Sequence, residues 1–162
     1  MPTVNSYKRM GVGAPSSGAT WAPAYVSYGA NNRTQMFRVP EEVASRTGAA
    51  TVPRTPYLAL TAVLTSGLDG VDRNLDPGDP NTDNLFLLSR EEIADKGIHS
   101  VPPTLLHAAD ELAKDDVLRE AFGPGRDGSD YLDYYVSVKQ AEFHAYHATV
   151  TNWETDRYLI LF

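Results

Sequence analysis

The chain changes character at residue 55, and this change limits the folds that it can form. Residues 1–55 are rich in Gly, Pro, Ser, Thr and Asn, with only short stretches of strand-like pattern. Such strands carry too few apolar residues for a core of their own. Residues 56–162 instead repeat apolar residues at helical spacing. The sequence therefore predicts an α/β (α+β) fold, in which strands complete a sheet begun elsewhere and helices cover it.

Short strands are expected in the first part. Residues 24–28 alternate between apolar and polar side chains, residues 34–39 have a second strand pattern, and residues 29–32 between them favour a turn. Residues 5–9 form a third candidate strand. We expect these short strands to be antiparallel.

Three main helices are expected in the second part, over residues 56–74, over 104–122, and from Ser129 or Asp130 to about 149. Pro56 suits a first helical turn, and Gly123 followed by proline ends the second helix. The apolar tail from Trp153 onward is expected to dock on another surface.

Composition excludes several classes of function. The 162 residues include no cysteine, which rules out disulfides and thiolate chemistry. A net charge of −7 argues against non-specific binding to nucleic acid or acidic membranes. No apolar run approaches the roughly 20 residues that span a bilayer, and no signal peptide is recognisable. These features favour a cytoplasmic protein.

The candidate binding residues are four cations, Lys8, Arg9, Arg33 and Arg38. Arginine offers a planar, permanently charged fork that matches carboxylate and phosphate oxygens. Arg33 and Arg38 would face opposite sides of one continuous strand, because they are five residues apart. The residues alone favour the alternative of solvated cations at a strand edge.

Several motifs resemble the glutamine synthetase family, in order and at matching spacing over nearly the whole chain. The resemblance implies the C-terminal part of that family's catalytic domain. The matching segments are Asn-Ser-Tyr-Lys-Arg at 5–9, Asn-Arg-Thr-Gln-Met-Phe-Arg-Val-Pro at 32–40, Pro-Tyr-Leu-Ala at 56–59, Ser-Gly-Leu-Asp-Gly at 66–70, Lys-Gln-Ala-Glu at 139–142 and Thr-Asn-Trp-Glu at 151–154.

The resemblance also implies roles for matching residues. Arg9 would bind the carboxylate of glutamate, and Arg33, as the catalytic residue, would contact the γ-phosphate of ATP and the acyl phosphate formed from it. Arg38 would contact ATP phosphate. The complete enzyme would use ATP with Mg²⁺ or Mn²⁺, would join glutamate to an amine through γ-glutamyl phosphate, and would be a homo-oligomer.

Two departures bear on substrate and regulation. Trp21, in Gly-Ala-Thr-Trp-Ala-Pro, stands where many bacterial members carry a glutamate that helps to bind ammonium, and this run resembles the type III-like branch and γ-glutamylmethylamide synthetases. Either ammonia or a small alkylamine is therefore expected as the substrate, and a packed loop aromatic is the alternative for Trp21. Phe86 stands where some members carry an adenylylated tyrosine, and it has no hydroxyl to modify.

A further departure lies in residues 43–55. The family has Arg-x-Glu-x-Arg and then Asn-Pro here, with the glutamate as a metal ligand, but this segment contains no acidic residue. Arg46 is not assigned the family arginine's role, and no metal ligand is assigned. A GC-rich coding of this segment read in another frame would restore the motif, so we hypothesise two compensating frameshifts, which the nucleotide sequence would test.

The chain begins almost at the first family motif, so we expect it to lack the parts needed for turnover alone. The alternative is a catalytically inactive remnant or an assembly module of the same family. A metal shared by His144 and His147, or a calcium site at Asp76, Asp79 and Asp83, is less expected than a solvated helix face and a polar turn. The tyrosines at 131, 134, 135 and 146 are expected to pack.

Overall fold

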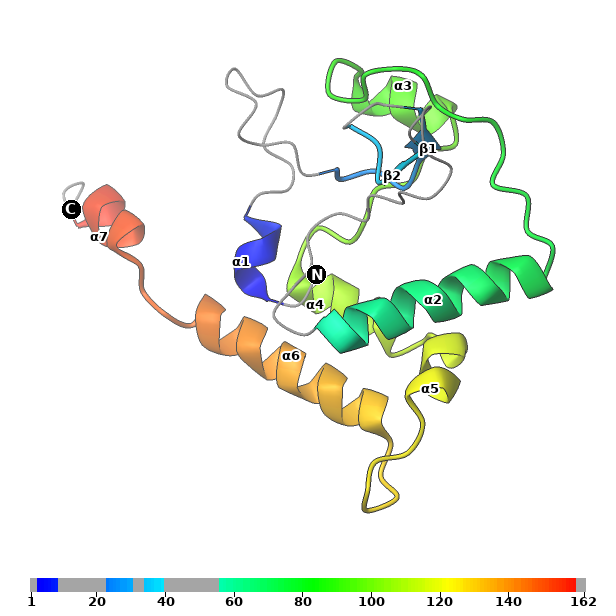
Figure 1. Ribbon diagram of the computed structural model, residues 1–162. Coiled ribbons are helices and arrows are strands. Elements are labelled where there is room, and N and C mark those ends of the chain that lie inside the picture. Colours follow the sequence, from blue (N-terminus) through cyan, green and yellow to red (C-terminus); the bar gives the residue numbers. More distant parts are fainter. Residues whose placement is uncertain (1–2, 9–22, 31–33, 40–55, 160–162) are drawn as a thin grey trace.

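The computed structural model describes residues 3–8, 23–30, 34–39 and 56–159 (Figure 1). It confirms a mixed α/β fold with a small sheet and a larger group of helices. No helix among the described residues combines the length and apolar character needed to cross a membrane. The elements in chain order are α1 (Val4–Tyr7), β1 (Tyr28–Gly29), β2 (Phe37–Arg38), α2 (Pro56–Asp72), α3 (Arg90–Asp95), α4 (Leu105–Leu112), α5 (Asp116–Phe122), α6 (Tyr131–His147) and α7 (Asn152–Tyr158).

The two strands pair in parallel, so the expected antiparallel pairing between them is wrong. Tyr28 lies opposite Phe37, and Gly29 lies opposite Arg38. The predicted hairpin assumed one continuous strand over 34–39. Residues 34–36 instead form a turn and bend, and the side chain of Gln35 is buried. This interruption leaves two residues in each strand.

Antiparallel pairing occurs elsewhere, between residues 24–26 and the segment that follows α3. The Val26 amide donates to the His99 carbonyl at 2.8 Å, and the Val101 amide donates to the Ala24 carbonyl at 2.9 Å. Tyr25 and Ser100 form an isolated antiparallel bridge. Sequence-local reasoning could not supply this long-range partner.

The third candidate strand, over residues 5–9, is also wrong, because Val4–Tyr7 is the short helix α1. Its first turn leaves backbone amides in need of acceptors. The Val4 amide donates to the Glu142 carboxylate of α6 at 3.1 Å. A contact with a distant helix therefore supports a conformation that the strand pattern did not predict.

Two of the three expected helices are confirmed, as α2 and α6. The Asp130 carboxylate caps α6 and accepts from the Leu132 amide at 2.8 Å. The expected helix over 104–122 is divided into α4 and α5, because Asp115 starts a new helix and accepts from the Leu118 amide at 2.9 Å. Gly123, with a φ of 65°, ends α5 as predicted.

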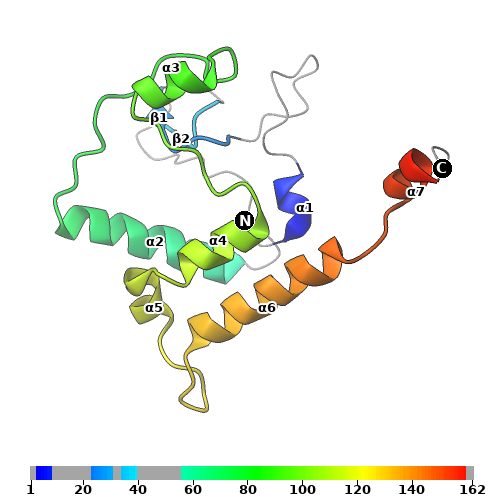
Figure 2. The same cartoon turned by 180° about the vertical axis from the view of Figure 1, so that it is seen from behind.

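The apolar tail forms a further helix, α7, which opens with a capping box between Thr151 and Glu154. The rings of Trp153 and Tyr158 meet edge to face at 6.0 Å. Both side chains are nevertheless mostly exposed. The predicted docking partner of this tail is thus not provided by the described residues, and the tail leads away from the other helices in both views (Figure 2).

The helical group has a small core in which α4 packs on α6. Leu105 and Ala109 of α4 are buried together with Leu132 and Val136 of α6. Gln140 adds a hydrogen bond from α6 to Asp110 at 2.9 Å. Helix α2 packs on α5, outside this core.

Candidate functional site

The strand pair holds Arg38, the one arginine of the predicted site that lies among the described residues. The Phe37 amide donates to the Ser27 carbonyl at 3.1 Å, and the Val39 amide donates to the Gly29 carbonyl at 2.9 Å. These bonds fix the backbone on both sides of Arg38. Its half-buried side chain therefore starts from a fixed position beside Gly29.

Gly29 is needed where the loop of residues 76–84 crosses strand β1. The Asn81 amide donates to the Tyr28 carbonyl at 2.8 Å. A Cβ atom at Gly29 would lie 2.2 Å from the Asn81 carbonyl oxygen, which is too close for any real contact. Only glycine allows the loop to pack directly against the strand that lies opposite Arg38.

The buried side chain of Gln35 links the same loop to the strand segment through hydrogen bonds. The side chain is only 3% exposed. Its amide oxygen accepts from the Ser27 hydroxyl, and its amide nitrogen donates to the Asp83 carbonyl at 3.3 Å. A buried amide with both ends bonded fixes orientation, because breaking either bond leaves a buried polar atom without a partner. Sequence reasoning missed Gly29 and Gln35 as supports of Arg38.

Of the other candidate cations, only Lys8 has a described position. Arg9 and Arg33 lie outside the described residues, as do Trp21 and residues 43–55. Lys8 is described and lies at the end of α1, with its ammonium 4.9 Å from the centre of the Tyr146 ring. The expected convergence of three guanidinium groups therefore stays a prediction.

A group of contacts joins α1, the helix just before Arg9, to α6. Sequence reasoning also missed this group. Lys139 and Glu142 form an ion pair at 2.8 Å. Burial raises the pKa of Glu142, but bonds from Lys139 and the Val4 amide outweigh it, so the pKa of Glu142 is lowered. Burial, with a smaller contribution from Tyr135, raises the pKa of Tyr7 to about 12. The only advance sign was the spacing of Lys139 and Glu142, which also belongs to a family-like motif.

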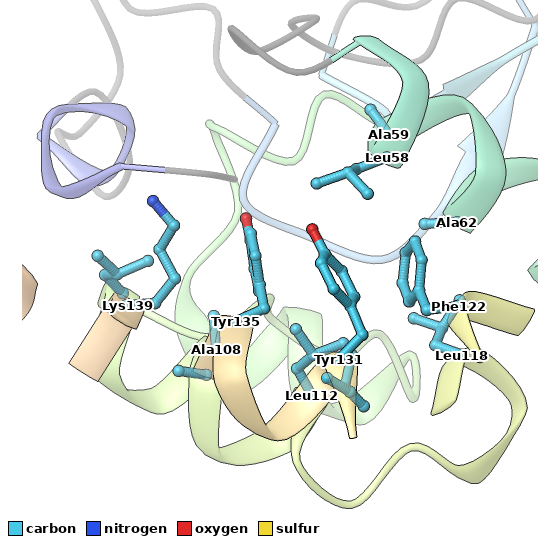
Figure 3. Close-up of a pocket in the computed structure, with 13 residues that line it drawn as sticks. Leu58, Ala59, Ala62, Ala108, Leu112, Leu118, Phe122, Tyr131, Tyr135 and Lys139 are labelled. Carbon is cyan, nitrogen blue, oxygen red and sulfur yellow. The ribbon is translucent and has the colours of Figure 1, made fainter. Parts of the chain in front are cut away.

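An apolar cavity of about 250 Å³ adjoins this group of contacts between α2, α4, α5 and α6 (Figure 3). The rings of Tyr131 and Tyr135 stack 6.4 Å apart along it, with Lys139 at one end and Phe122 at the other. Tyr131 also contacts Phe122, with ring centres 5.8 Å apart. The expectation that these tyrosines pack is therefore met at positions 131 and 135.

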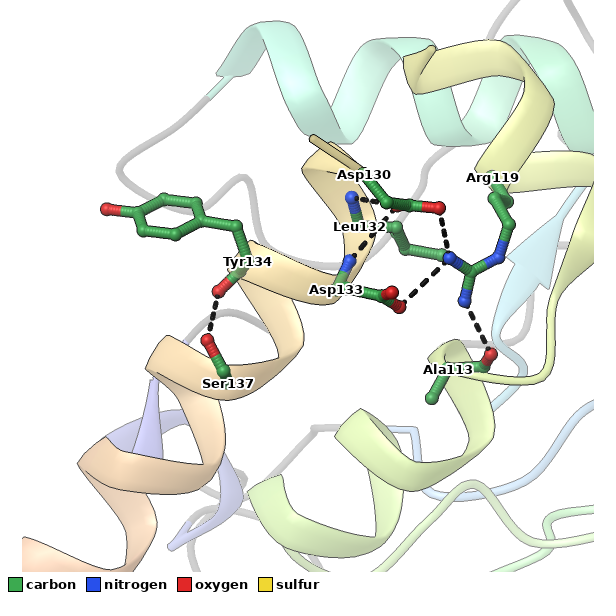
Figure 4. Close-up of polar contacts among 7 residues, drawn as sticks. All are labelled: Ala113, Arg119, Asp130, Leu132, Asp133, Tyr134 and Ser137. Atoms are coloured by element: carbon green, nitrogen blue, oxygen red, sulfur yellow. Dashed lines mark hydrogen bonds and ion pairs between the residues drawn. The ribbon is translucent and has the colours of Figure 1, made fainter. Parts of the chain in front are cut away.

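Arg119 shows a guanidinium used for structure (Figure 4). It pairs with Asp130, bonds Asp133 at 2.9 Å and donates to the Ala113 carbonyl at 2.9 Å. The hydrogen bond from Arg119 holds the pKa of Asp130 below its usual value. The interaction joins α4, α5 and the start of α6. Arg119 is thus a positioning group for the helices, in contrast to Arg38, for which the described part of the chain provides no such set of carboxylate partners.

The histidines of α6 and the first aspartate of the 76–84 loop have local partners. His144 and His147 both lie beside the Phe143 ring, with ring centres 5.8 and 5.7 Å away. Asp76 accepts from the Gly78 amide at 2.9 Å, as expected for a polar turn. Among the residues that the structure describes, no three His, Asp or Glu side chains lie close enough together to hold a metal ion.

Comparison with protein families gives a match over residues 1–158 to the family model described as glutamine synthetase, catalytic domain. Glutamate–methylamine ligase of Methyloversatilis universalis is 42% identical over 99% of this chain and 35% of its own length. Glutamine synthetase of Methanosarcina mazei is 35% identical over 98% of this chain and 34% of its own length. The chain thus spans about a third of the length of these relatives.

Comparison with solved structures gives the same result. A structure described as a GmaS/ADP complex has a TM-score of 0.75 and 34% sequence identity, and the match covers 98% of this chain and 34% of that one. A structure described as apo GmaS without ligand has a TM-score of 0.66 at 31% identity. Fold and sequence therefore indicate the same relatives.

Proposed function

Because the chain belongs to the glutamine synthetase family, through that family's catalytic domain, we propose that it is part of an ATP-dependent ligase joining glutamate to ammonia or a small alkylamine. The observation that carries this proposal is the fixed position of Arg38. The parallel register, the Gly29 contact and the buried Gln35 amide all hold the strand from which Arg38 projects. Such preorganisation suits a cation that must meet charge where it develops.

Each predicted arginine has a distinct role in this proposal. Arg9 binds the carboxylate of glutamate, Arg38 binds ATP phosphate, and Arg33 stabilises the phosphoryl group during its transfer. The side-chain carboxylate of glutamate attacks the γ-phosphorus of ATP and ADP leaves. The amine nitrogen then attacks the resulting acyl phosphate, loses a proton, and releases inorganic phosphate. Positioned cations favour both steps, since both concentrate negative charge on phosphoryl oxygens.

The comparisons favour methylamine over ammonia as the second substrate. The methylamine ligase is 42% identical to this chain, and the glutamine synthetase of Methanosarcina mazei is 35% identical. The tryptophan at position 21 agrees with this choice, because it places no anion where a glutamate would attract ammonium. An ADP complex of a structural relative supports nucleotide binding.

Divalent metal is part of the family's chemistry, but the residues described here do not by themselves fit a metal site. Segment 43–55 also lacks the acid expected from the family. Hard cations such as Mg²⁺ need carboxylate oxygens. We therefore assign the metal ligands to the remainder of a family catalytic chain and route no step through the metal here.

Homo-oligomer formation and a cytoplasmic location complete the proposal. The exposed apolar side chains of α7 and of its C-cap residue support the first, since Trp153 and Leu159 are 64% and 74% exposed. The cysteine-free sequence supports the second.

The test is a measurement of glutamate-dependent phosphate release by the full chain, alone and with the non-matching two-thirds of the Methyloversatilis ligase supplied in trans. We expect release only in the second case, with methylamine preferred to ammonium. Arg38→Gln should lower the rate by about 10²–10³-fold, as for the loss of one transition-state donor. Arg126→Gln, in an exposed loop, is the control for lost charge.

If no phosphate is released even with the complementary part present, the alternative of a catalytically inactive remnant is favoured. Equal rates for the Arg38→Gln and Arg126→Gln variants would remove Arg38 from the site. A preference for ammonium would overturn the choice of amine while leaving the ligase proposal in place.

A further inference from the structure

Helix α2 turns a continuous apolar stripe toward solvent. Its members repeat at intervals of three or four residues, so they share one helix face. Each is between 56% and 84% exposed. This surface, called the α2 stripe below, consists of Tyr57, Leu60, Leu64, Leu68 and Val71.

The opposite face of α2, which lies against the other helices, carries fewer large apolar side chains. Leu58, Ala59 and Ala62 line the cavity shared with α4, α5 and α6. No residue of α2 is buried. The helix therefore directs most of its larger apolar groups away from the rest of the described structure, the reverse of what burial of apolar surface favours.

The stripe has the chemistry of a permanent interface. No charged residue occurs from 57 to 68, and the first charge, Asp69, is paired with Arg73 at 3.0 Å. Charged residues are depleted at the centres of interfaces, and obligate interfaces are the more apolar ones. Figures 1 and 2 show α2 at the side of the helical group, and the exposure of its stripe leaves that side open to a partner.

The length of the relatives indicates which partner covers the α2 stripe. The chain aligns over nearly all of its own length, yet it spans only 35% of the methylamine ligase and 34% of the chain in the GmaS/ADP complex. Each relative therefore contains about twice as much further chain as the part that matches. A helix of the matched part with an uncovered apolar face is where that further chain would pack.

We propose that the α2 stripe is the docking surface for the remaining two-thirds of a glutamine synthetase-family catalytic chain. The inference rests on the proposed function, and it adds the surface through which the site is completed. It holds whether the remainder belongs to the same polypeptide or arrives as a separate one. Docking there covers the five apolar side chains and joins α2 to the part of the family fold that this chain does not match.

The test uses the full 162-residue chain, co-expressed with a tagged fragment of the Methyloversatilis ligase comprising the two-thirds outside the match. The wild-type chain should form a soluble complex with the fragment at equal stoichiometry. Leu64→Asp with Leu68→Asp should lower its recovery by at least about tenfold, the effect of 1.4 kcal/mol in binding. Leu87→Asp, at an apolar residue 74% exposed outside α2, should leave recovery unchanged.

A second pair of substitutions protects the test from misfolding. Leu64→Ala with Leu68→Ala keeps helix propensity while removing apolar area. This pair should also weaken the complex, with unchanged circular dichroism of the chain alone. Normal recovery of both double variants would overturn the proposal, as would the absence of any complex with the wild-type chain.

Self-association is the remaining outcome. If the chain alone forms a dimer in sedimentation that Leu64→Asp dissociates, a second copy occupies the stripe and the proposal is wrong. The readout is independent of turnover. A complex that forms through the stripe but releases no phosphate would contradict the ligase proposal and leave the docking surface intact.

Discussion

Helices α2 and α6 both contain 17 residues, yet they are held in opposite ways. Helix α6 buries Leu132 and Val136 against α4, and its first turn is capped by Asp130. Helix α2 buries no side chain and presents its larger apolar residues to solvent. Helical periodicity thus marks both helices, but among the described residues only α6 fully buries apolar side chains against its partner, whereas α2 packs on α5 without burying any.

The largest expected difference comes from truncating one leucine in each helix. Leu132→Ala should lower the free energy of unfolding by about 2–5 kcal/mol, because Leu132 is 1% exposed and its removal leaves a cavity. Leu68→Ala should change it by less than about 0.5 kcal/mol, since that side chain already meets water. Urea unfolding followed by circular dichroism measures both. Equal losses would mean that the stripe is packed in the isolated chain.

Glycine-to-alanine substitutions sharpen the comparison, because the two sites should respond with opposite sign. Gly29→Ala should destabilise by about 1–3 kcal/mol, because its Cβ would overlap a backbone carbonyl. Gly70→Ala in α2 meets no atom within 4 Å and should stabilise by about 0.5–1 kcal/mol through helix propensity. Midpoints of urea unfolding report both changes. A neutral Gly29→Ala would show that the 76–84 loop does not rest on the strand.

Acidification should produce the smallest effect and should act on the start of α6. The pKa of Asp130 is lowered in the folded chain, chiefly by its bond from Arg119. Its contribution is therefore complete above the ordinary value of 3.8 and is lost as the pH falls through the lower, folded-state value. Asp130→Asn, which can still cap the helix, should flatten the decline of the melting temperature in this range.

Asp72→Asn removes one carboxylate from the end of α2 and is the matched control for net charge. The decline with acid should be the same for this variant as for the wild-type chain. An unchanged decline in Asp130→Asn would show that other carboxylates govern the acid response.

The sequence predicted the helices where one apolar face runs without interruption. Helix α6 has the expected start at Asp130 and nearly the expected end. The division between α4 and α5 was missed because apolar spacing continues across it. The side chain of Asp115 caps α5 and so begins a new helix there. The neighbouring sequence gave no clear reason to choose Asp115 over Asp116 as the capping residue.

The strands were predicted less well because their partners are distant. Tyr25 pairs with Ser100, and Gln35, just before β2, donates to the Asp83 carbonyl. Neither relation follows from neighbouring residues. Of the predicted site, Arg38 is placed on a strand as expected, while the supporting roles of Gly29 and Gln35 depend on a loop that comes much later in the chain.

The contact between Gly29 and Asn81 couples the position of the 76–84 loop to that of strand β1. A strand and a loop in direct backbone contact move as one piece, so the 76–84 loop cannot be displaced without pulling on the residue opposite Arg38. Leu85, almost wholly buried, anchors the far end of that loop. We expect a bulky group attached to the outer side of this turn to shift the strand opposite Arg38 and, through that strand, the position of the Arg38 guanidinium.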